Sequence, residues 1–434
     1  MSEPRSNVGT AGRRILRRGA QGVRRTVARR PRIFLYLSIL GPGVITANAG
    51  NDAGGIATFS SVGAEHGYKL LWLLIPLIIS LGIVQEMCAR MGAVTGKGLA
   101  DLIRERFGVR WTALVMFALL IANGGVTVSE FVGIAAAMEL FGIARYISVP
   151  IAAFAIWWLV VKGSYQRVER VFLVMSLVFL GYVVSAFLAH PSWGTVARAT
   201  VHPSFEFSPL YLFTFVAIIG TTISPYMQVF IQSSVVEKGV RPEKYYLTRA
   251  DVWVGTVFAI AIVFFIVIST AATLNVRGEH VDSAAQAARA LGPLAGVYAQ
   301  LLFGVGLFGA SMVAAGVVPL ATAYSISEAF GFEKGVSNTF REAPTFLGIF
   351  TFLVALGALV AMMPGLPIIR VLLVTQVING VLLPVILIAV LRLVNNRELM
   401  GRYVNGPLYN IAAWTTTVIV SASSLLLIGV TIFR

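Results

Sequence analysis

The sequence predicts an all-α polytopic membrane protein with eleven transmembrane helices. Of its 434 residues, 57% are hydrophobic and only 12% are charged, whereas an ordinary soluble domain carries about 25% charged residues. This composition excludes a soluble globular protein. The 42 glycines fit helices that pack closely in lipid, because small residues let helix backbones approach one another there.

Eleven apolar stretches approach or exceed the length of about 20 residues that a helix needs to cross a bilayer. They cover residues 34–60, 68–94, 111–141, 146–161, 169–189, 207–236, 247–274, 293–330, 342–362, 368–394 and 409–433. The basic leader, residues 1–33, is too long for a cleavable signal peptide and runs directly into a span of full length. We expect it to be a disordered cytoplasmic tail that helps to set the orientation, or alternatively a basic amphipathic helix on anionic lipid.

The basic residues predict the orientation in the membrane. With the N-terminus inside, 26 of the 34 Lys and Arg residues lie in inside segments and seven in outside segments. The positive-inside rule then places the N-terminus in the cytoplasm and the C-terminus outside, in the plasma (inner) membrane. Because these charges lie in the leader and in short loops, the net charge of +15 does not indicate nucleic-acid binding. No obligate protein partner is evident, and the single Cys88 excludes an intrachain disulfide.

Two predicted spans contain polar and helix-breaking residues at mid-depth. The first interruption is Asn48–Gly55 and the second is Thr221–Tyr226. Lipid tolerates such backbone only where it lines a cavity within the protein. The interruptions occupy corresponding positions if residues 34–205 and 206–394 are two five-helix repeats and residues 395–434 add one more helix. Paired interruptions of this kind predict an inverted-repeat transporter that binds its substrate near the midplane.

Asp52 is the acidic residue at these interruptions. A carboxylate at the bilayer centre costs roughly 2.5–3.5 kcal/mol on insertion scales, so it needs a function. We predict a cation ligand that acts with unwound backbone carbonyls, with oxygen atoms of Thr221 and Ser224 opposite and amides of Gln376 and Asn379 in the tenth span. The alternative is a structural cap on the N-terminus of a half-helix.

Several runs of sequence carry a resemblance to a known family. They are Leu40-Gly41-Pro42-Gly43, Gly67-Tyr68-Lys69-Leu70-Leu71-Trp72, Gly92-Ala93-Val94-Thr95-Gly96-Lys97 and Ser129-Glu130-Phe131-Val132-Gly133. With them, the chain is similar over nearly all its spans to the NRAMP divalent-metal transporters. The resemblance implies a LeuT-type fold of two inverted five-helix repeats, with helices 1 and 6 broken. It also implies a transporter without enzymatic activity or cofactor, whose divalent metal ion is the transported substrate.

The chain departs from this family at the metal site. The family's Asp-Pro-Gly-Asn is here Asp52-Ala53-Gly54-Gly55, and its Met-Pro-His is here Ser224-Pro225-Tyr226. The carboxylate is retained, but the amide and the soft thioether are lost, which favours a hard and partly hydrated ion such as Mg²⁺. In this the chain resembles the NRAMP-related magnesium transporters.

The resemblance implies a set of site residues. The expected ligands are Asp52, Thr221 through its carbonyl, Ser224 through its hydroxyl, and Gln376. Residues expected to shape the pocket are Asn51, Gly55, Tyr226, Met227 and Asn379. Met227 is a possible substitute for the lost thioether. Because it lies three positions beyond Ser224, however, we expect its side chain to point away from the site.

Proton coupling in the transition-metal transporters of the family uses a third-span Asp and sixth-span histidines, which are Thr127, Tyr226 and Ile231 here. Glu130 is either a residual proton site or a structural hydrogen-bond partner, and Glu86 has the spacing for an ion pair with Arg90. We therefore predict uptake of Mg²⁺, and also Mn²⁺, by alternating access without proton coupling. The membrane potential supplies roughly 4.6 kcal/mol for a double charge across 100 mV.

Four alternatives remain open at this point. The first is a proton-coupled Mn²⁺ or Fe²⁺ transporter of the NRAMP type. A sodium-coupled amino-acid symporter shares the fold class, but Asp52 argues against an anionic group at the first break. An intramembrane hydrolase would need a second catalytic carboxylate, a Ser–His pair or a zinc site, and no such motif is recognisable. A channel fits two broken helices less well than a carrier does.

Overall fold

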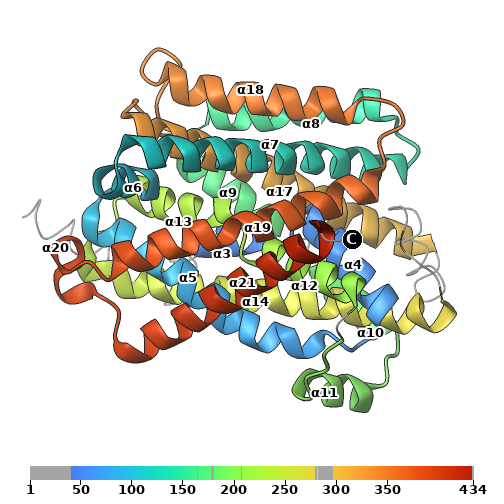
Figure 1. Ribbon diagram of the computed structural model, residues 1–434. Helices are drawn as coiled ribbons and strands as arrows, with labels where there is room; N and C mark the ends of the chain where they lie inside the picture. Colours follow the sequence, from blue (N-terminus) through green and yellow to red (C-terminus); the bar gives the residue numbers. More distant parts are fainter. Residues whose placement is uncertain are drawn as a thin grey trace, which may run out of the picture. The chain divides into compact units, whose positions relative to one another are not determined.

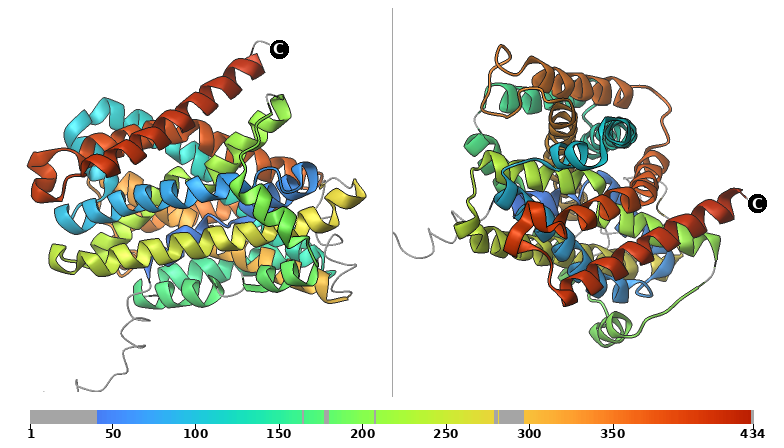
Figure 2. Two further views of the ribbon diagram at one scale, coloured as in Figure 1. Left: turned by 90° about the horizontal axis from the view of Figure 1, so that it is seen from below. Right: turned by 60° about the vertical axis from the view of Figure 1, so that its left-hand side comes forward.

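The computed structural model describes residues 41–163, 165–176, 180–206, 208–278, 281 and 297–432. Every regular element within these ranges is a helix (Figures 1 and 2). The α-helices are α3 (Pro42–Ala49), α4 (Ala53–His66), α5 (Leu74–Thr95), α6 (Leu99–Phe107), α7 (Val109–Glu139), α8 (Arg145–Val161), α9 (Tyr165–Ser176), α10 (Leu180–Leu188), α11 (Trp193–Val201), α12 (Pro209–Thr222), α13 (Pro225–Glu237), α14 (Tyr245–Thr273), α17 (Val297–Phe330), α18 (Pro344–Ala361), α19 (Ile368–Val394), α20 (Arg397–Met400) and α21 (Pro407–Ile432). The short 3-10 turns are η1 (Leu71–Leu73), η3 (Pro242–Lys244), η4 (Asn275–Arg277) and η5 (Gly401–Tyr403). The predicted leader lies outside the described residues.

Among the described residues, eight helical stretches are long and apolar enough to cross a membrane. They are Leu71–Thr95, Val109–Glu139, Pro209–Glu237, Pro242–Thr273, Phe303–Phe330, Pro344–Ala361, Ile368–Val394 and Pro407–Gly429. The all-α membrane fold is therefore confirmed, although the count of eleven is not. The predicted first span begins outside the described residues, the fourth is the 17-residue helix α8, and the fifth is described in two parts, α9 and α10.

Both predicted helix breaks are present. Helix 1 is divided into α3 and α4 at residues 50–52, and helix 6 into α12 and α13 at residues 223–224. At the second break, Ser224 has extended backbone angles and Pro225 is the first residue of α13. A proline disfavours helical geometry in the residue before it and supplies no N–H group, so Ile223 and Ser224 end one helix and Pro225 begins the next.

Both broken helices cross a neighbouring helix very closely, helix 1 near its start and helix 6 beside its break. α14 packs against both α3 and α4, and α12 packs against α19. A β-carbon at Gly43 of α3 would lie 2.6 Å from the backbone nitrogen of Val252 in α14, and one at Gly255 would lie 2.7 Å from the carbonyl oxygen of Gly43. In the same way, a β-carbon at Gly220 would lie 2.6 Å from the backbone nitrogen of Gly380. Glycine thus provides the close approach of helices that the composition predicted.

The start of α3 is capped by a carboxylate distant in the sequence. Asp251 of α14 is buried, and it accepts hydrogen bonds from the backbone N–H groups of Gly41 at 2.9 Å, Gly43 at 2.7 Å and Val44 at 3.4 Å. The first N–H groups of a helix have no acceptor within that helix, and lipid offers none. Asp251 therefore satisfies groups that would otherwise be buried without a partner. The sequence analysis did not single out this residue.

An ion pair packs against the same end of α3. Lys238, at the C-cap of α13, lies 2.8 Å from Glu169 of α9, and both charged groups contact Gly41, where any β-carbon would clash with them. Residues of α9, α13 and α14 therefore all contact the start of α3.

We expect replacement of Asp251 to destabilise the folded protein. Asp251→Leu leaves up to three buried N–H groups without an acceptor, each costing about 1–3 kcal/mol, whereas Asp251→Asn keeps one acceptor oxygen. In detergent, we expect the melting temperature to fall from wild type to Asp251→Asn and again to Asp251→Leu. The value for Asp251→Leu should be several degrees below that of the wild type. Size-exclusion chromatography after heating measures this. The exposed Glu243 provides the matched control, Glu243→Leu, and a wild-type melting temperature for Asp251→Leu would contradict the capping role.

Candidate functional site

Asp52 lies at the break in helix 1 and is fully buried. It is the N-cap of α4, where its Oδ1 accepts a hydrogen bond of 2.5 Å from the backbone N–H of Gly55. Its carboxylate also faces Tyr226 of α13, whose hydroxyl lies 3.4 Å from Oδ2. Because residues 50–52 are not helical, Asp52 and the backbone carbonyls before it are free to face other elements.

The break in helix 6 lies opposite Asp52. The Tyr226 hydroxyl donates a 2.8 Å hydrogen bond to the carbonyl oxygen of Ala49, which ties α13 to the end of α3. Ser224 donates to the carbonyl oxygen of Gly220 at 2.7 Å and to that of Thr221 at 3.3 Å. The two breaks therefore face one another: the first presents carboxylate and carbonyl oxygens, and the second presents hydroxyl and carbonyl oxygens.

Gly55 lies where these oxygens converge. A β-carbon at this position would lie 2.7 Å from the carbonyl oxygen of Gly50, 2.9 Å from Oγ1 of Thr221 and 3.2 Å from Oδ1 of Asp52. The backbone of Gly55 is therefore surrounded by three oxygen atoms from two chain segments. Any larger residue here must displace at least one of them.

Gln376 and Asn379 reach the site from α19. The amide nitrogen of Gln376 lies 3.2 and 3.3 Å from the two carboxylate oxygens of Asp52, and its amide oxygen accepts a 3.3 Å hydrogen bond from Asn379. Gln376 packs directly against Gly54, where a β-carbon would clash with it. In this arrangement Gln376 orients the carboxylate, because its nitrogen rather than its oxygen faces Asp52.

Met227 and Asn51 flank the break in helix 1. The terminal methyl of Met227 packs against Gly50, at a distance that leaves no room for a β-carbon, and Gln85 lies 3.9 Å from its sulfur. The expectation that Met227 points elsewhere is therefore wrong: residues three apart in a helix lie on one face. Asn51 donates a 3.1 Å hydrogen bond to the carbonyl oxygen of Ala259, which fixes the break to α14.

Glu130 of α7 is a hydrogen-bond acceptor at the start of α4. Its Oε2 accepts from the backbone N–H of Ala53 at 3.0 Å, and its Oε1 accepts from Ser129 at 3.3 Å. Thr127 donates to the carbonyl of Asn123 in its own helix. Of the described histidines, His66 ends α4, and His190 and His202 flank α11.

Glu86 forms the expected ion pair rather than part of the site. Its carboxylate lies 3.3 Å from the guanidinium of Arg90, one turn later in α5. Arg90 also donates to the carbonyl oxygen of Tyr403 at 3.0 Å and to the side chain of Asn405. This pair joins α5 to the segment before α21.

A buried carboxylate that the sequence analysis missed, Glu328, lies at the end of α17 in a charged cluster with Lys334 and the half-buried Asp101. Glu328 accepts a 2.6 Å hydrogen bond from Ser233 of α13 and lies 3.5 Å from Lys334, which pairs with Asp101 of α6 at 2.6 Å. The signal for this cluster in the sequence was the presence of isolated acidic residues near the ends of apolar spans. The pairing itself could not be predicted, since Lys334 and Asp101 lie far apart in the sequence.

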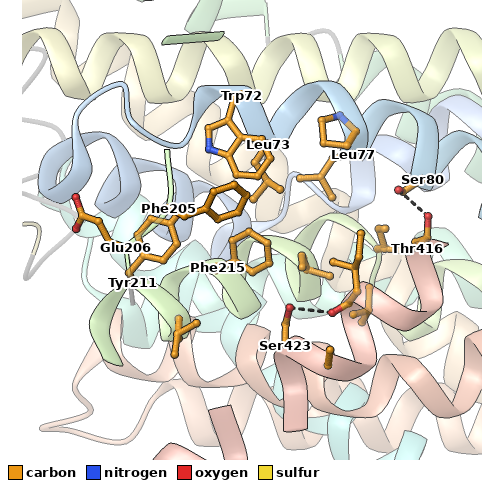
Figure 3. A pocket seen from close by; sticks show the side chains of 17 residues that line it. Trp72, Leu73, Leu77, Ser80, Phe205, Glu206, Tyr211, Phe215, Thr416 and Ser423 are labelled. Atoms are coloured by element: carbon orange, nitrogen blue, oxygen red, sulfur yellow. Dashed lines mark hydrogen bonds between the residues drawn. The ribbon is translucent and has the colours of Figure 1, made fainter. Parts of the chain in front are cut away.

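A cavity of about 480 Å³ lies near the site but differs from it in chemistry. It lies between the start of α5, α12 and α21, and Figure 3 shows the apolar and aromatic side chains that line most of it, including Trp72, Phe205 and Phe215. Its polar end is Glu206, whose pKa is lowered by the hydrogen bond and charge of Lys69 at 2.6 Å. Its inner end is Ile223, directly before Ser224. An apolar lining does not suit a metal ion, so the cavity is not the candidate site.

The donors at the two breaks are chemically hard. They are one carboxylate with the carbonyl and hydroxyl oxygens of Gly50, Thr221 and Ser224. Within the ranges that the structure describes, no group of three His, Cys, Asp or Glu side chains could hold a metal ion. Oxygen donors of this kind suit hard cations and their bound waters better than soft metals.

Comparisons with known proteins agree on one family. Residues 43–429 match the family model described as natural resistance-associated macrophage protein-like, or Nramp. A divalent metal cation transporter, MntH, of Ralstonia nicotianae is 29% identical over 94% of this chain and 94% of its own length. The MntH of Klebsiella pneumoniae is 27% identical over 91% of this chain and 94% of its own length.

The solved structures agree in fold. The manganese transporter of Eremococcus coleocola superimposes with a TM-score of 0.73 at 19% identity, covering 92% of this chain and 88% of that one. MhsT in complex with L-phenylalanine superimposes with a TM-score of 0.60 at 14% identity, covering 89% and 97%. The two MntH proteins and the Eremococcus coleocola protein are named as transporters rather than enzymes. Because the family model matches residues 43–429, which are most of this chain, the chain belongs to the Nramp family.

Proposed function

We propose that this protein transports divalent cations, chiefly Mg²⁺ and also Mn²⁺, into the cell by alternating access. The observation that carries the proposal is the group of hard oxygen atoms around Asp52 and Gly55. The divalent ion is then the transported substrate, and no cofactor is needed. The names of the relatives support a divalent metal as the substrate class.

The donor set supports Mg²⁺ over a softer metal. We propose that Asp52 ligates directly or through water, with the Thr221 carbonyl and the Ser224 hydroxyl as further donors. Gln376 would join them only if its amide rotated, because its nitrogen now faces Asp52. One carboxylate with neutral oxygens suits an ion that gives up its waters reluctantly.

We propose that the ion is bound partly hydrated, because the donors at the breaks are one carboxylate and neutral oxygens. Gly55 contributes through the side chain that it lacks, since a β-carbon there would already clash with the Gly50 carbonyl oxygen. We propose that Asn51, Tyr226 and Asn379 shape the pocket around the ion without ligating it.

The contacts of Glu130 support transport without proton coupling. Its two oxygens accept hydrogen bonds from Ala53 and Ser129, as expected for a structural acceptor. The third-span position that carries Asp in proton-coupled relatives is Thr127, which donates within its own helix. The membrane potential is then the driving force.

A second candidate function is proton-coupled transport of Mn²⁺ or Fe²⁺. The contact between the Met227 methyl and Gly50 favours it, because a thioether beside the break could ligate a softer ion. The names of the relatives, MntH and manganese transporter, point the same way.

For the membrane topology, we propose the plasma (inner) membrane with a cytoplasmic N-terminus and an external C-terminus, as the distribution of basic residues indicates. We propose that the repeats 34–205 and 206–394 move relative to one another around the site, and that residues 395–434 form an additional helix.

Reconstituted protein tests substrate and coupling together. In liposomes with an internal pH dye, we expect saturable Mg²⁺ uptake without acidification, driven by an inside-negative potential. Asp52→Ala should abolish uptake, because it removes the carboxylate that faces Tyr226 at the second break. The control is Glu105→Ala, an exposed carboxylate paired with Lys97. Acidification in step with Mg²⁺ entry would refute uncoupled transport, and Mn²⁺ uptake without Mg²⁺ uptake would favour the second candidate.

Substitution of Gly55 tests the position of the ion. Gly55→Ala places a methyl 2.7 Å from the Gly50 carbonyl oxygen, so we expect Mg²⁺ uptake to fall at least tenfold while the protein still folds. Gly124→Ala is the matched control, since a β-carbon there meets no atom within 4 Å. Equal uptake by the two variants would show that the ion binds elsewhere.

Met227→Leu separates the two candidate functions. Leucine has a similar volume and no sulfur, although its shorter side chain lacks the terminal methyl that packs against Gly50. We expect Mg²⁺ and Mn²⁺ uptake to stay within about twofold of wild type. A tenfold loss of Mn²⁺ uptake with Mg²⁺ unaffected would assign the thioether a role as ligand.

A further inference from the structure

A groove runs between α7 and α19. It consists of two adjoining cavities of about 350 and 150 Å³ that share Val115 and Val385 in their linings. The larger cavity ends at Trp111 and Arg392, and the smaller ends at Pro225. The groove therefore leads from a helix terminus to the break in helix 6.

The length of the groove matches one leaflet of a bilayer. On α19 it extends from Leu382 to Arg392, which is about 15 Å at the rise of an α-helix. The hydrocarbon core of a bilayer is about 30 Å thick. A groove of this length reaches from the edge of the core to its middle, where Pro225 begins α13.

The charges of the groove lie at its outer end. Its lining is apolar except for Arg392, an exposed residue in the last turn of α19. Arg110, next to Trp111 in the chain, is also exposed. In the part of the chain that the structure describes, neither guanidinium forms an ion pair, whereas the neighbouring Arg106 lies 3.6 Å from Glu398. Trp111 itself is of the type enriched at membrane interfaces.

We propose that this groove binds an anionic phospholipid, with one acyl chain between α7 and α19 and the phosphate paired with Arg392. The apolar lining fits the chain, the unpaired guanidinium complements the phosphate, and basic pockets between membrane helices bind anionic headgroups. The predicted cytoplasmic position of Arg392 would place the site in the leaflet rich in anionic lipid. The end of the chain then contacts Pro225, beside the candidate ion site, so the lipid supports the start of α13.

The cavity of Figure 3 is a natural comparison within the same molecule. It is also apolar and also ends at the break in helix 6, at Ile223, but its charged lining residue is the acidic Glu206. A lipid in that cavity gains nothing from a negative headgroup. Of these two apolar cavities, the groove is therefore the one expected to prefer anionic lipid.

Native mass spectrometry of the purified full chain tests this inference. With equal amounts of phosphatidylglycerol and phosphatidylcholine, we expect at least a fivefold preference for phosphatidylglycerol. Arg392→Gln should reduce the preference below twofold, and Ala389→Phe, which fills the groove, should lower the occupancy of both lipids. The controls are Arg370→Gln at the other end of α19 and Ala422→Phe in the cavity of Figure 3, and both should keep the wild-type preference.

A phosphatidylglycerol with a photoreactive group at the end of its acyl chain locates the site. We expect labelled peptides around residues 118–122 of α7 or around Pro225. An excess of inorganic phosphate should not displace the lipid, because the acyl chain supplies most of the buried apolar area. The proposal is overturned if Arg392→Gln and Ala389→Phe bind lipid as wild type does, if Arg370→Gln loses the preference equally, if free phosphate displaces the lipid, or if the label lies elsewhere.

Discussion

Every buried backbone group at the two helix breaks needs a partner from within the protein, and the rest of the structure follows from this requirement. A broken helix exposes N–H and C=O groups that lipid cannot satisfy. Asp251 accepts from the start of α3, Asp52 and Glu130 accept from the start of α4, and Tyr226 donates to the end of α3. These polar side chains are tolerated at mid-depth because each one replaces hydrogen bonds that a continuous helix would make for itself.

The same requirement allows Asp52 to have both roles that the sequence analysis presented as alternatives, the cap of a half-helix and a ligand of a cation. Asp52 caps α4 through Gly55, and its second oxygen faces Tyr226 and Gln376. A carboxylate has about four acceptor positions on its two oxygens, so the cap does not exhaust its capacity. The residue can hold the half-helix and still coordinate a cation, and the Gly55 backbone brings both functions to one point.

Local sequence signals predicted the breaks, and only the three-dimensional structure revealed their partners. Gly50, Asp52 and Pro225 carry conformational or electrostatic signals that can be recognised within a few residues. Asp251 caps an N-terminus 210 positions away in the chain, and no local pattern indicates that pairing. The wrong direction for Met227 has a different cause, since three helical residues turn the chain by about 300° and return it almost to the same face. The residue types alone predicted hard oxygen ligands. That these oxygens converge on Gly55 could be seen only in the three-dimensional structure.

The attachment of α3 to α14 has a mechanical consequence. The half-helix is fixed to this one neighbour at its beginning by Asp251 and by the Gly43–Gly255 crossing, and just past its end by the bond from Asn51 to Ala259. Because α3 is attached to α14 at both ends, it cannot tilt without α14. Any motion of α3 during a transport cycle must therefore move α14 as well. The two helices would then rotate together about residues 50–52.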